Sequence, residues 1–185
     1  MRIRISIAML LPIILLLGCK QEVLPKPRAF LRLEYPEVKT ATLQTDHFIF
    51  QYNRMAQIKE KKAQSLTLDY PGMKGTIFVN YKPVAGNLIK LLADAQKFSY
   101  EHVVKADAIE PKIFENPKDR VYGMFYAVSG DAASQAQFYV TDSINHFVTG
   151  SLYFYAKPNY DSIYPAAVYL QNDILTIMET LRWRD

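Results

Sequence analysis

The chain has 185 residues, half of them hydrophobic, and it includes 13 tyrosines and ten phenylalanines. This length fits one domain with a sizeable core and leaves little room for a second. The formal charge is +4, of which Arg2 and Arg4 supply two units. The sequence has no basic stripe interleaved with stacking aromatic residues, so we expect no nucleic-acid partner. The single cysteine excludes an internal disulfide.

Residues 1–18 have the layout of a bacterial signal peptide. Arg2 and Arg4 form a short positive region, and residues 5–17 form an apolar run of thirteen residues. A membrane-spanning helix needs ~20 apolar residues, so this run is too short to cross a bilayer. The run ends in Leu-Leu-Gly-Cys at residues 16–19, which resembles a lipobox, the signal for lipid attachment.

The lipobox predicts a membrane anchor at Cys19. By resemblance to other lipoprotein signals, the Cys19 thiol receives a diacylglycerol, signal peptidase II cuts after Gly18, and the new amino group is acylated. Each buried methylene contributes ~0.8 kcal/mol, so two or three acyl chains hold a protein on the membrane essentially permanently. The alternative is an ordinary cleaved signal followed by a stray buried cysteine.

Residues 19–28 contain two prolines and are typical of an extended tether. At ~3.1 Å per residue, the part after the cysteine holds the domain roughly 28 Å from the lipid. By resemblance to other diderm lipoproteins, the absence of aspartate at Lys20 favours transfer to the outer membrane. Residues 20–22 have too few acidic side chains to argue for export to the cell surface, so we expect the domain to face the periplasm.

The first half of the domain is predicted to consist of strands. Alternation of apolar and polar residues predicts strands at residues 28–35 and 47–52. Residues 64–68 and 76–81 flank a Tyr-Pro-Gly turn at residues 70–72, and they are predicted to form a hairpin or a longer connection.

A helix is predicted from residue 88 to residue 106, with Asn87 as its N-cap. Its apolar stripe is expected to face the core and consists of Leu88, Leu91, Leu92, Ala95, Phe98, Ser99, His102 and Ala106. His102, at the centre of the stripe, is either a buried proton switch or ligand, or a core histidine with a satisfied hydrogen bond; we favour the core histidine. Pro111 is expected to stop any continuation of the helix.

Three segments predict an antiparallel meander: residues 121–128, 135–142 and 146–155. Turn residues at 129–131 and 142–143 separate them. In the second and third segments, apolar residues at alternate positions define a core face. These core-facing positions are Ala136, Phe138, Val140, Val148, Leu152 and Phe154.

A last helix is predicted over residues 163–181, where apolar residues recur at steps of four and three. Asp161 or Ser162 is its expected N-cap, and Pro165 is acceptable in the first turn. Trp183 is expected to close the core just after the helix.

Together these elements predict one α+β domain over residues 29–185. It has a mostly antiparallel sheet of about six or seven strands, a C-terminal three-stranded meander and two packed helices. The order of strands, helix, meander and helix is similar to that of the PsbP/Mog1-like sandwich, which is an analogy of fold alone.

Candidate catalytic and metal-binding groups are scarce. His47 and His146 each begin a strand and have no acidic or cysteine neighbour at ligand spacing, so we expect no metal site. Ser134 lies between two strands and not on the strand-to-helix elbow that a serine nucleophile needs. Asp142 and Asp161 could form a glycosidase pair, but both lie at turn signals. We therefore expect neither catalysis nor a cofactor.

Three tyrosines of the meander, Tyr139, Tyr153 and Tyr155, fall on the polar register of their strands. An exposed group of tyrosines is a composition that protein interfaces favour, so these three form the candidate interaction surface. The alternative is that a helix covers both faces of the sheet and buries the rings. Tyr122 and Tyr126 cannot be assigned to a face, because both registers of their strand are apolar.

Several further segments of the chain are distinctive beside the lipobox: AFLRLEYP at residues 29–36, YPGMKGTI at 70–77, QFYVTDS at 137–143, PNYDSI at 158–163 and ETLRW at 179–183. In the lipobox and these segments, the chain resembles the gliding-motility lipoprotein GldD family of Bacteroidetes. The resemblance covers essentially the whole mature chain, and the family has no catalytic motif that could be carried over.

The resemblance implies a non-enzymatic envelope component that surface gliding requires. It would act alongside other gliding lipoproteins, in a machinery coupled to type IX secretion of the adhesins. We therefore expect a lipid-anchored assembly or scaffolding subunit. Two hypotheses from other classes stay open: a small-ligand-binding lipoprotein with a pocket between sheet and helix, and an envelope hydrolase, which a carboxylate pair facing a cleft would indicate.

Overall fold

The computed structural model describes residues 35–62, 64–100, 105–155 and 159–184. The predicted signal peptide, Cys19 and the tether lie outside the described residues, as do His102 and residues 28–34 of the first predicted strand. Tyr35, the end of that predicted strand, is described and belongs to no strand.

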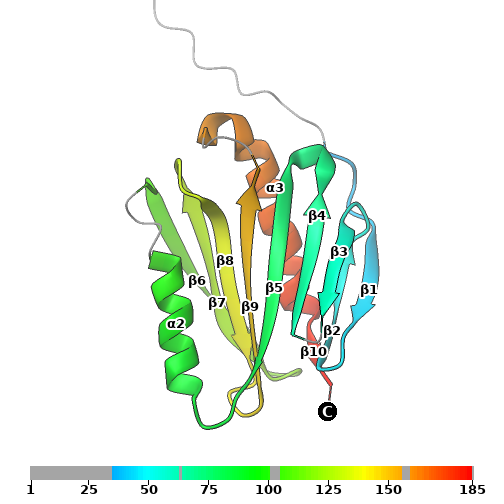
Figure 1. Ribbon diagram of the computed structural model, residues 1–185, viewed down its shortest axis with the longest axis vertical. Coiled ribbons are helices and arrows are strands. Elements are labelled where there is room, and N and C mark those ends of the chain that lie inside the picture. The colour runs from blue at the N-terminus through cyan, green and yellow to red at the C-terminus, as the bar shows by residue number, and fades with distance from the viewer. Residues whose placement is uncertain (1–34, 63, 101–104, 156–158, 185) are drawn as a thin grey trace, which may run out of the picture.

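Seven strands form one antiparallel sheet (Figure 1). Their bounds are β3 (Gln57–Lys62), β4 (Ser65–Tyr70), β5 (Gly75–Pro83), β6 (Ala108–Asn116), β7 (Val121–Ser129), β8 (Ser134–Thr141) and β9 (His146–Phe154). They lie in the order β3-β4-β5-β9-β8-β7-β6, and each neighbouring pair is antiparallel. The predicted α+β class, the antiparallel sheet and the meander β7-β8-β9 are confirmed.

A second, smaller sheet joins residues from the two ends of the domain. It contains β1 (Thr40–Gln44), β2 (Phe48–Asn53) and β10 (Arg182–Trp183), in the order β1-β2-β10. Trp183 pairs with Phe48, so the chain returns to its first strands after the last helix.

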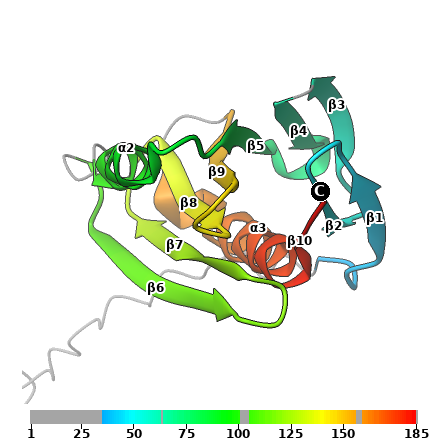
Figure 2. The same ribbon diagram turned by 90° about the horizontal axis from the view of Figure 1, so that it is seen from below.

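The two helices lie on opposite faces of the large sheet (Figure 2). Helix α3 (Tyr160–Thr180) lies between the curled large sheet and the small sheet, whereas α2 (Leu88–Tyr100) lies against the outer face of the large sheet. We call the face toward α3 the inner face and the face toward α2 the outer face. As predicted, the apolar stripe is completely buried from residue 167 onward: Ala167, Leu170, Ile174 and Ile177 of α3, and Leu181 just after the helix, are all inaccessible.

The start of α3 differs from its prediction. The helix begins at Tyr160, so Asp161 and Ser162 lie in its first turn and neither is the N-cap. The physical reason is that Asp131 Oδ1, from the β7–β8 connection, accepts the Tyr160 N–H at 2.8 Å and so binds a free donor at the helix start. Pro165 consequently lies inside the helix.

The sequence prediction also missed four strands and misplaced the end of the first helix. Strands β1, β3, β6 and β10 were not predicted. Pro111 lies within β6, which is tolerated because β6 is an edge strand whose outer side pairs with no neighbour in the described sheet. Lys105 and Ala106 are not helical, since the chain there turns into β6, and the Asp107 N–H donates to the Ser129 carbonyl at 2.9 Å.

One carboxylate lies inside the core between α3 and the small sheet. Asp173 is only 2% exposed, and the Asn53 amide donates to its Oδ2 at 3.0 Å. Burial raises the pKa of Asp173 above its usual value, against the opposing effect of the Asn53 hydrogen bond. Burial, followed by the nearby Asp173 charge, also raises the pKa of Tyr70. This cluster is the polar part of an otherwise apolar layer.

Candidate functional site

An open cleft of about 580 Å³ lies between α2 and the outer face of the large sheet. Side chains from β4, β5, β8 and β9 form its floor, and Leu91, Asp94, Ala95, Phe98 and Ser99 of α2 form one wall. The volume lies within the range of ~300–1,000 Å³ that is typical of small-molecule sites.

The floor of the cleft carries polar side chains in register. One row of directly paired residues crosses the four strands in the order Ser65, Asn80, Thr149 and Tyr139. In the next row along, Ser151 pairs with Gln137. Successive residues of a strand point to opposite faces, so the apolar partners of these residues fill the inner face while hydroxyl and amide groups face α2.

Helix α2 touches this floor at two places. Leu91 and Ser99 are its buried residues, and the Ser99 hydroxyl lies 3.1 Å from Gln137 Oε1. Gln137 in turn donates to the Phe98 carbonyl at 3.3 Å. Phe98, predicted to face the core, is 59% exposed. The predicted apolar stripe packs down only in part, because the surface beneath it is polar.

The structure separates the three tyrosines of the candidate interaction surface. Tyr139 and Tyr153 are half-buried and line the cleft. The Tyr139 ring stacks on Phe147 with centroids 5.6 Å apart and an interplanar angle of 9°. Tyr155 lies outside the cleft lining and is 65% exposed, with its hydroxyl 2.7 Å from Thr76 Oγ1.

Tyr126 shows where the helix does close the outer face. Its side chain is buried beneath Tyr100 at the end of α2, with the two rings edge to face at 6.1 Å. Burial, followed by the neighbouring hydroxyls of Tyr139 and Tyr100, raises the pKa of Tyr126 to about 12. The sequence could not assign this residue to a face, and the structure places it under the far end of the helix.

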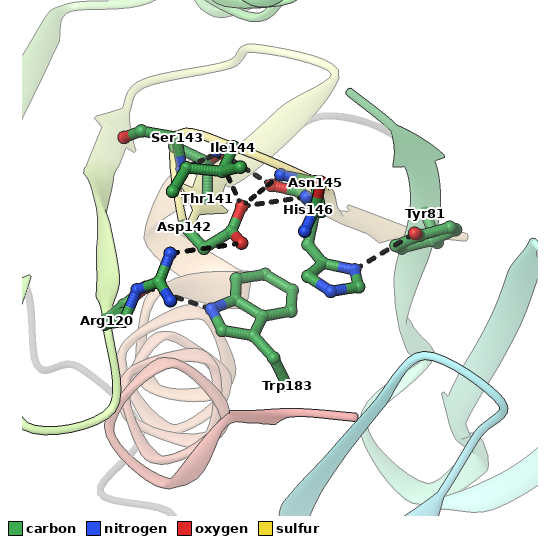
Figure 3. A network of polar contacts seen from close by, with 9 residues as sticks. All are labelled: Tyr81, Arg120, Thr141, Asp142, Ser143, Ile144, Asn145, His146 and Trp183. Carbon is green, nitrogen blue, oxygen red and sulfur yellow. Dashed lines mark hydrogen bonds and ion pairs between the residues drawn. The ribbon is translucent and has the colours of Figure 1, made fainter. Parts of the chain in front are cut away.

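The turn between β8 and β9 holds a compact polar network (Figure 3). Asp142 Oδ1 accepts the backbone N–H groups of Ile144, Asn145 and His146 at 3.0, 2.9 and 2.8 Å. Burial alone would raise the pKa of Asp142, but these hydrogen bonds outweigh burial and lower it. The carboxylate is therefore fully engaged in shaping the turn, as the sequence predicted for residues 142–143.

His146 joins this turn to the small sheet. Its Nδ1 lies 3.1 Å from the Tyr81 hydroxyl, and its ring stacks on Trp183 with centroids 5.0 Å apart (Figure 3). The Trp183 indole donates to the Arg120 carbonyl at 3.0 Å. Tyr81 also stacks on His47 at 4.0 Å. This arrangement could not be foreseen from the sequence, because its members come from three strands, β5, β9 and β10, and from two turns, without any fixed spacing.

The other groups weighed for chemistry have structural partners. The Ser134 hydroxyl donates to the Leu152 carbonyl at 3.0 Å within the sheet, and Asp161 lies in the first turn of α3. Within the described ranges, no three His, Cys, Asp or Glu side chains lie close enough together to hold a metal ion. In the same part of the chain, no helix is both long and apolar enough to span a membrane.

These features define a class of protein: a small α+β domain with an open cleft beneath one helix. A more particular assignment comes from the sequence. The family model of the gliding motility lipoprotein GldD matches residues 20–183, and the chain belongs to this family. Membership implies a role in gliding motility and a lipid-anchored place in the cell envelope. No curated protein matches the chain.

Proposed function

We propose that this protein is a non-enzymatic, lipid-anchored assembly component of the gliding machinery and of the type IX secretion coupled to it. Its partners are other lipoproteins and further subunits of that machinery. Family membership supports the gliding role, and the lipobox at residues 16–19 supports the anchor.

The observation that carries the assembly role is the position of the aromatic side chains. Tyr139 and Tyr153 line an open cleft, and Tyr155 exposes most of its surface beside the end of β9. Tyrosines with an exposed ring and an anchored hydroxyl are efficient contact residues, because little side-chain entropy is lost when a partner covers them. Meanwhile Ser134, Asp131 and Asp142 are engaged with backbone groups and are poorly placed for chemistry.

Site-specific photo-crosslinking tests this role. A photoreactive amino acid at Tyr155 should capture a specific envelope protein in intact gliding cells, and mass spectrometry would identify it. The matched control is Ile113, which is 76% exposed on the edge strand β6 and should capture nothing specific. A deletion strain that glides and secretes its adhesins normally would refute the proposal.

The proposed anchor is Cys19, after cleavage behind Gly18, with residues 19–28 as the tether and residues 29–185 as the periplasmic domain at the outer membrane. Cys19→Ser should abolish lipidation and leave the signal uncut or processed elsewhere. An unanchored form in the periplasm should fail to restore gliding at normal abundance, since a scaffold acts only where its partners are concentrated. Membrane fractionation and complementation measure the two effects, and full complementation would contradict the anchor's role.

A second candidate function has an observation of its own. The cleft beneath α2 is large enough for a small molecule, and it combines aromatic and polar side chains, as ligand pockets do. The protein would then be an envelope lipoprotein that binds a small ligand between sheet and helix. Calorimetric titration of the full chain with small-molecule probes tests this function independently of crosslinking at Tyr155.

A further inference from the structure

We infer that the cleft beneath α2 binds a neutral saccharide. The inference rests on the second candidate function and names the class of ligand. Its starting point is the mismatch between helix and sheet: an amphipathic helix stands over a floor of hydroxyl and amide groups, and the gap between them is open. A ligand that fills this gap must form hydrogen bonds with the polar side chains of the floor and also contact the aromatic rings.

The polar groups of the floor match the hydroxyl groups of a sugar. Asn80 and Thr149 lie directly opposite each other on β5 and β9, and Ser151 lies in the next row. Hydroxyl and amide side chains both donate and accept hydrogen bonds, as sugar hydroxyls do. Desolvating such a row is favourable only when each group regains a partner, which an apolar ligand cannot supply.

The charge of the cleft favours a neutral ligand. Among the lining residues that the structure describes, Lys82 and Asp94 carry charge, one of each sign. The charges of the lining side chains therefore cancel, and the described lining offers no cluster of cationic side chains with which to hold a phosphate or a carboxylate.

The aromatic side chains supply the second half of sugar recognition. The face of an aromatic ring carries partial negative charge, and it attracts the slightly positive axial C–H groups of a pyranose ring. Tyr139 is held in a fixed orientation by its stack on buried Phe147, and Tyr153 by its edge-to-face contact with Phe78 at 5.8 Å. Phe98 lines the cleft from the helix side.

The floor is poorly suited to the other obvious occupant, an extended peptide. A peptide that adds to a sheet needs strands with free backbone N–H and carbonyl groups. Here β5, β9 and β8 each pair with a neighbour on both sides, so their backbone groups are used within the sheet. The groups offered to a ligand are side chains, spaced across the strands rather than along one of them.

Saturation-transfer difference NMR on the full-length protein tests the inference. The protein should be kept in a detergent without a sugar headgroup, and the probes are maltose, cellobiose, glucuronate and a short alanine–serine peptide. A neutral disaccharide should receive saturation at millimolar concentration, most strongly on its ring C–H protons. Glucuronate and the peptide should receive little.

Paired variants locate the site. Thr149→Val keeps the shape of the side chain but removes its hydroxyl, and it should weaken disaccharide binding about tenfold. Thr42→Val, on an exposed position of β1, is its matched control and should bind as the wild type does. Ala95→Phe fills the cleft from α2 and should abolish binding, whereas Ala93→Phe, on the exposed side of the same helix, should not.

The outcomes distinguish failure of the saccharide inference from failure of the second candidate function, which is ligand binding in general. Absence of binding by both disaccharides overturns the inference, as does equal binding by the Ala95→Phe protein when circular dichroism shows it folded. Preference for glucuronate overturns the neutral charge of the proposed ligand, and preference for the peptide overturns its saccharide class; either result keeps a ligand-binding cleft. If no probe binds, the second candidate function loses its support as well, while the assembly role is still decided by crosslinking at Tyr155.

Discussion

The two faces of the large sheet are built from alternate residues of the same strands, yet they differ in almost every respect. On the inner face, Ile77, Leu152 and Val148 are completely buried in the hydrophobic core to which α3 contributes. On the outer face, Asn80, Thr149 and Ser151 of the same two strands line an open cleft under α2. Alternation along a strand lets one set of strands serve two purposes.

The inner face contributes most to the stability of the domain, whereas the outer face stays accessible for binding. Helix α3 has seven buried residues, whereas α2 has two among its described side chains. A binding surface must stay accessible and therefore contributes little to folding, while the packed face must supply most of the hydrophobic stabilisation. Substitutions on the inner face should therefore mainly lower the free energy of unfolding, whereas substitutions on the outer face should mainly affect binding.

The largest effect is expected on the inner face. Ile174→Ala, at a completely buried position of α3, should lower the free energy of unfolding by about 3 kcal/mol, because it creates a cavity in close-packed surroundings. Leu92→Ala, at a half-buried position of α2, should cost less than about 1 kcal/mol. Urea denaturation measures both. Equal losses of unfolding free energy in the two variants would contradict this prediction, because both faces would then contribute equally to stability.

A smaller loss in the free energy of unfolding is expected for substitutions of Asp142, in the turn between β8 and β9. Asp142→Ala leaves three backbone N–H groups without their acceptor and should cost about 2 kcal/mol, whereas Asp142→Asn keeps one side-chain oxygen and should cost less. Since the folded-state pKa of Asp142 is lowered, its contribution is present above its unfolded value and is lost as the pH falls through the folded pKa. Thermal unfolding across the acid range should therefore fall less steeply for Asp142→Ala than for the wild type.

Asp173 should show the opposite pH dependence, because burial raises its pKa. The folded state holds the proton more tightly than the unfolded state, so the wild type loses stability as the pH rises from the unfolded value through the folded pKa. Asp173→Asn lacks this loss. The stability of the variant relative to the wild type should therefore increase between about pH 3.5 and neutrality. A constant difference across that range would contradict the raised pKa.

The smallest effect is expected on the outer face. Thr149→Val should change the free energy of unfolding by less than about 0.5 kcal/mol, because the residue is half-buried and both side chains are β-branched. Urea denaturation is again the measurement. A loss as large as that of Ile174→Ala would mean that the hydroxyl row is part of the core.

How much of this could be foreseen depends on the range of the interactions involved. The meander and α3 were predictable, because alternation in residues 135–142 and the steps of four and three in residues 163–181 are local patterns that buried faces impose. Strand β3 has the polar sequence QIKEKK and β6 contains Pro111, so neither shows such a pattern. Edge strands are stabilised by pairing with one neighbour, which leaves little trace in their own residues.

The candidate sites were less predictable for the same reason. The three tyrosines were identified by their register, but their division between the cleft and the open surface depends on how α2 lies across the sheet, which is a tertiary arrangement. The contact of His146 with Tyr81 and Trp183 joins residues far apart in the chain. The early start of α3 depended on Asp131, a residue 29 positions away, which no capping rule based on neighbours includes.

The small sheet also sets an order of assembly. Its third strand pairs Trp183 with Phe48, and Arg184 donates to the Thr45 carbonyl from 139 positions further along the chain. When the chain emerges with its amino end first, β2 keeps an open edge until residues 182–184 follow. Until then, that edge has backbone groups that can pair with other chains. The small sheet can therefore be complete only when the domain has been synthesised as far as these last residues.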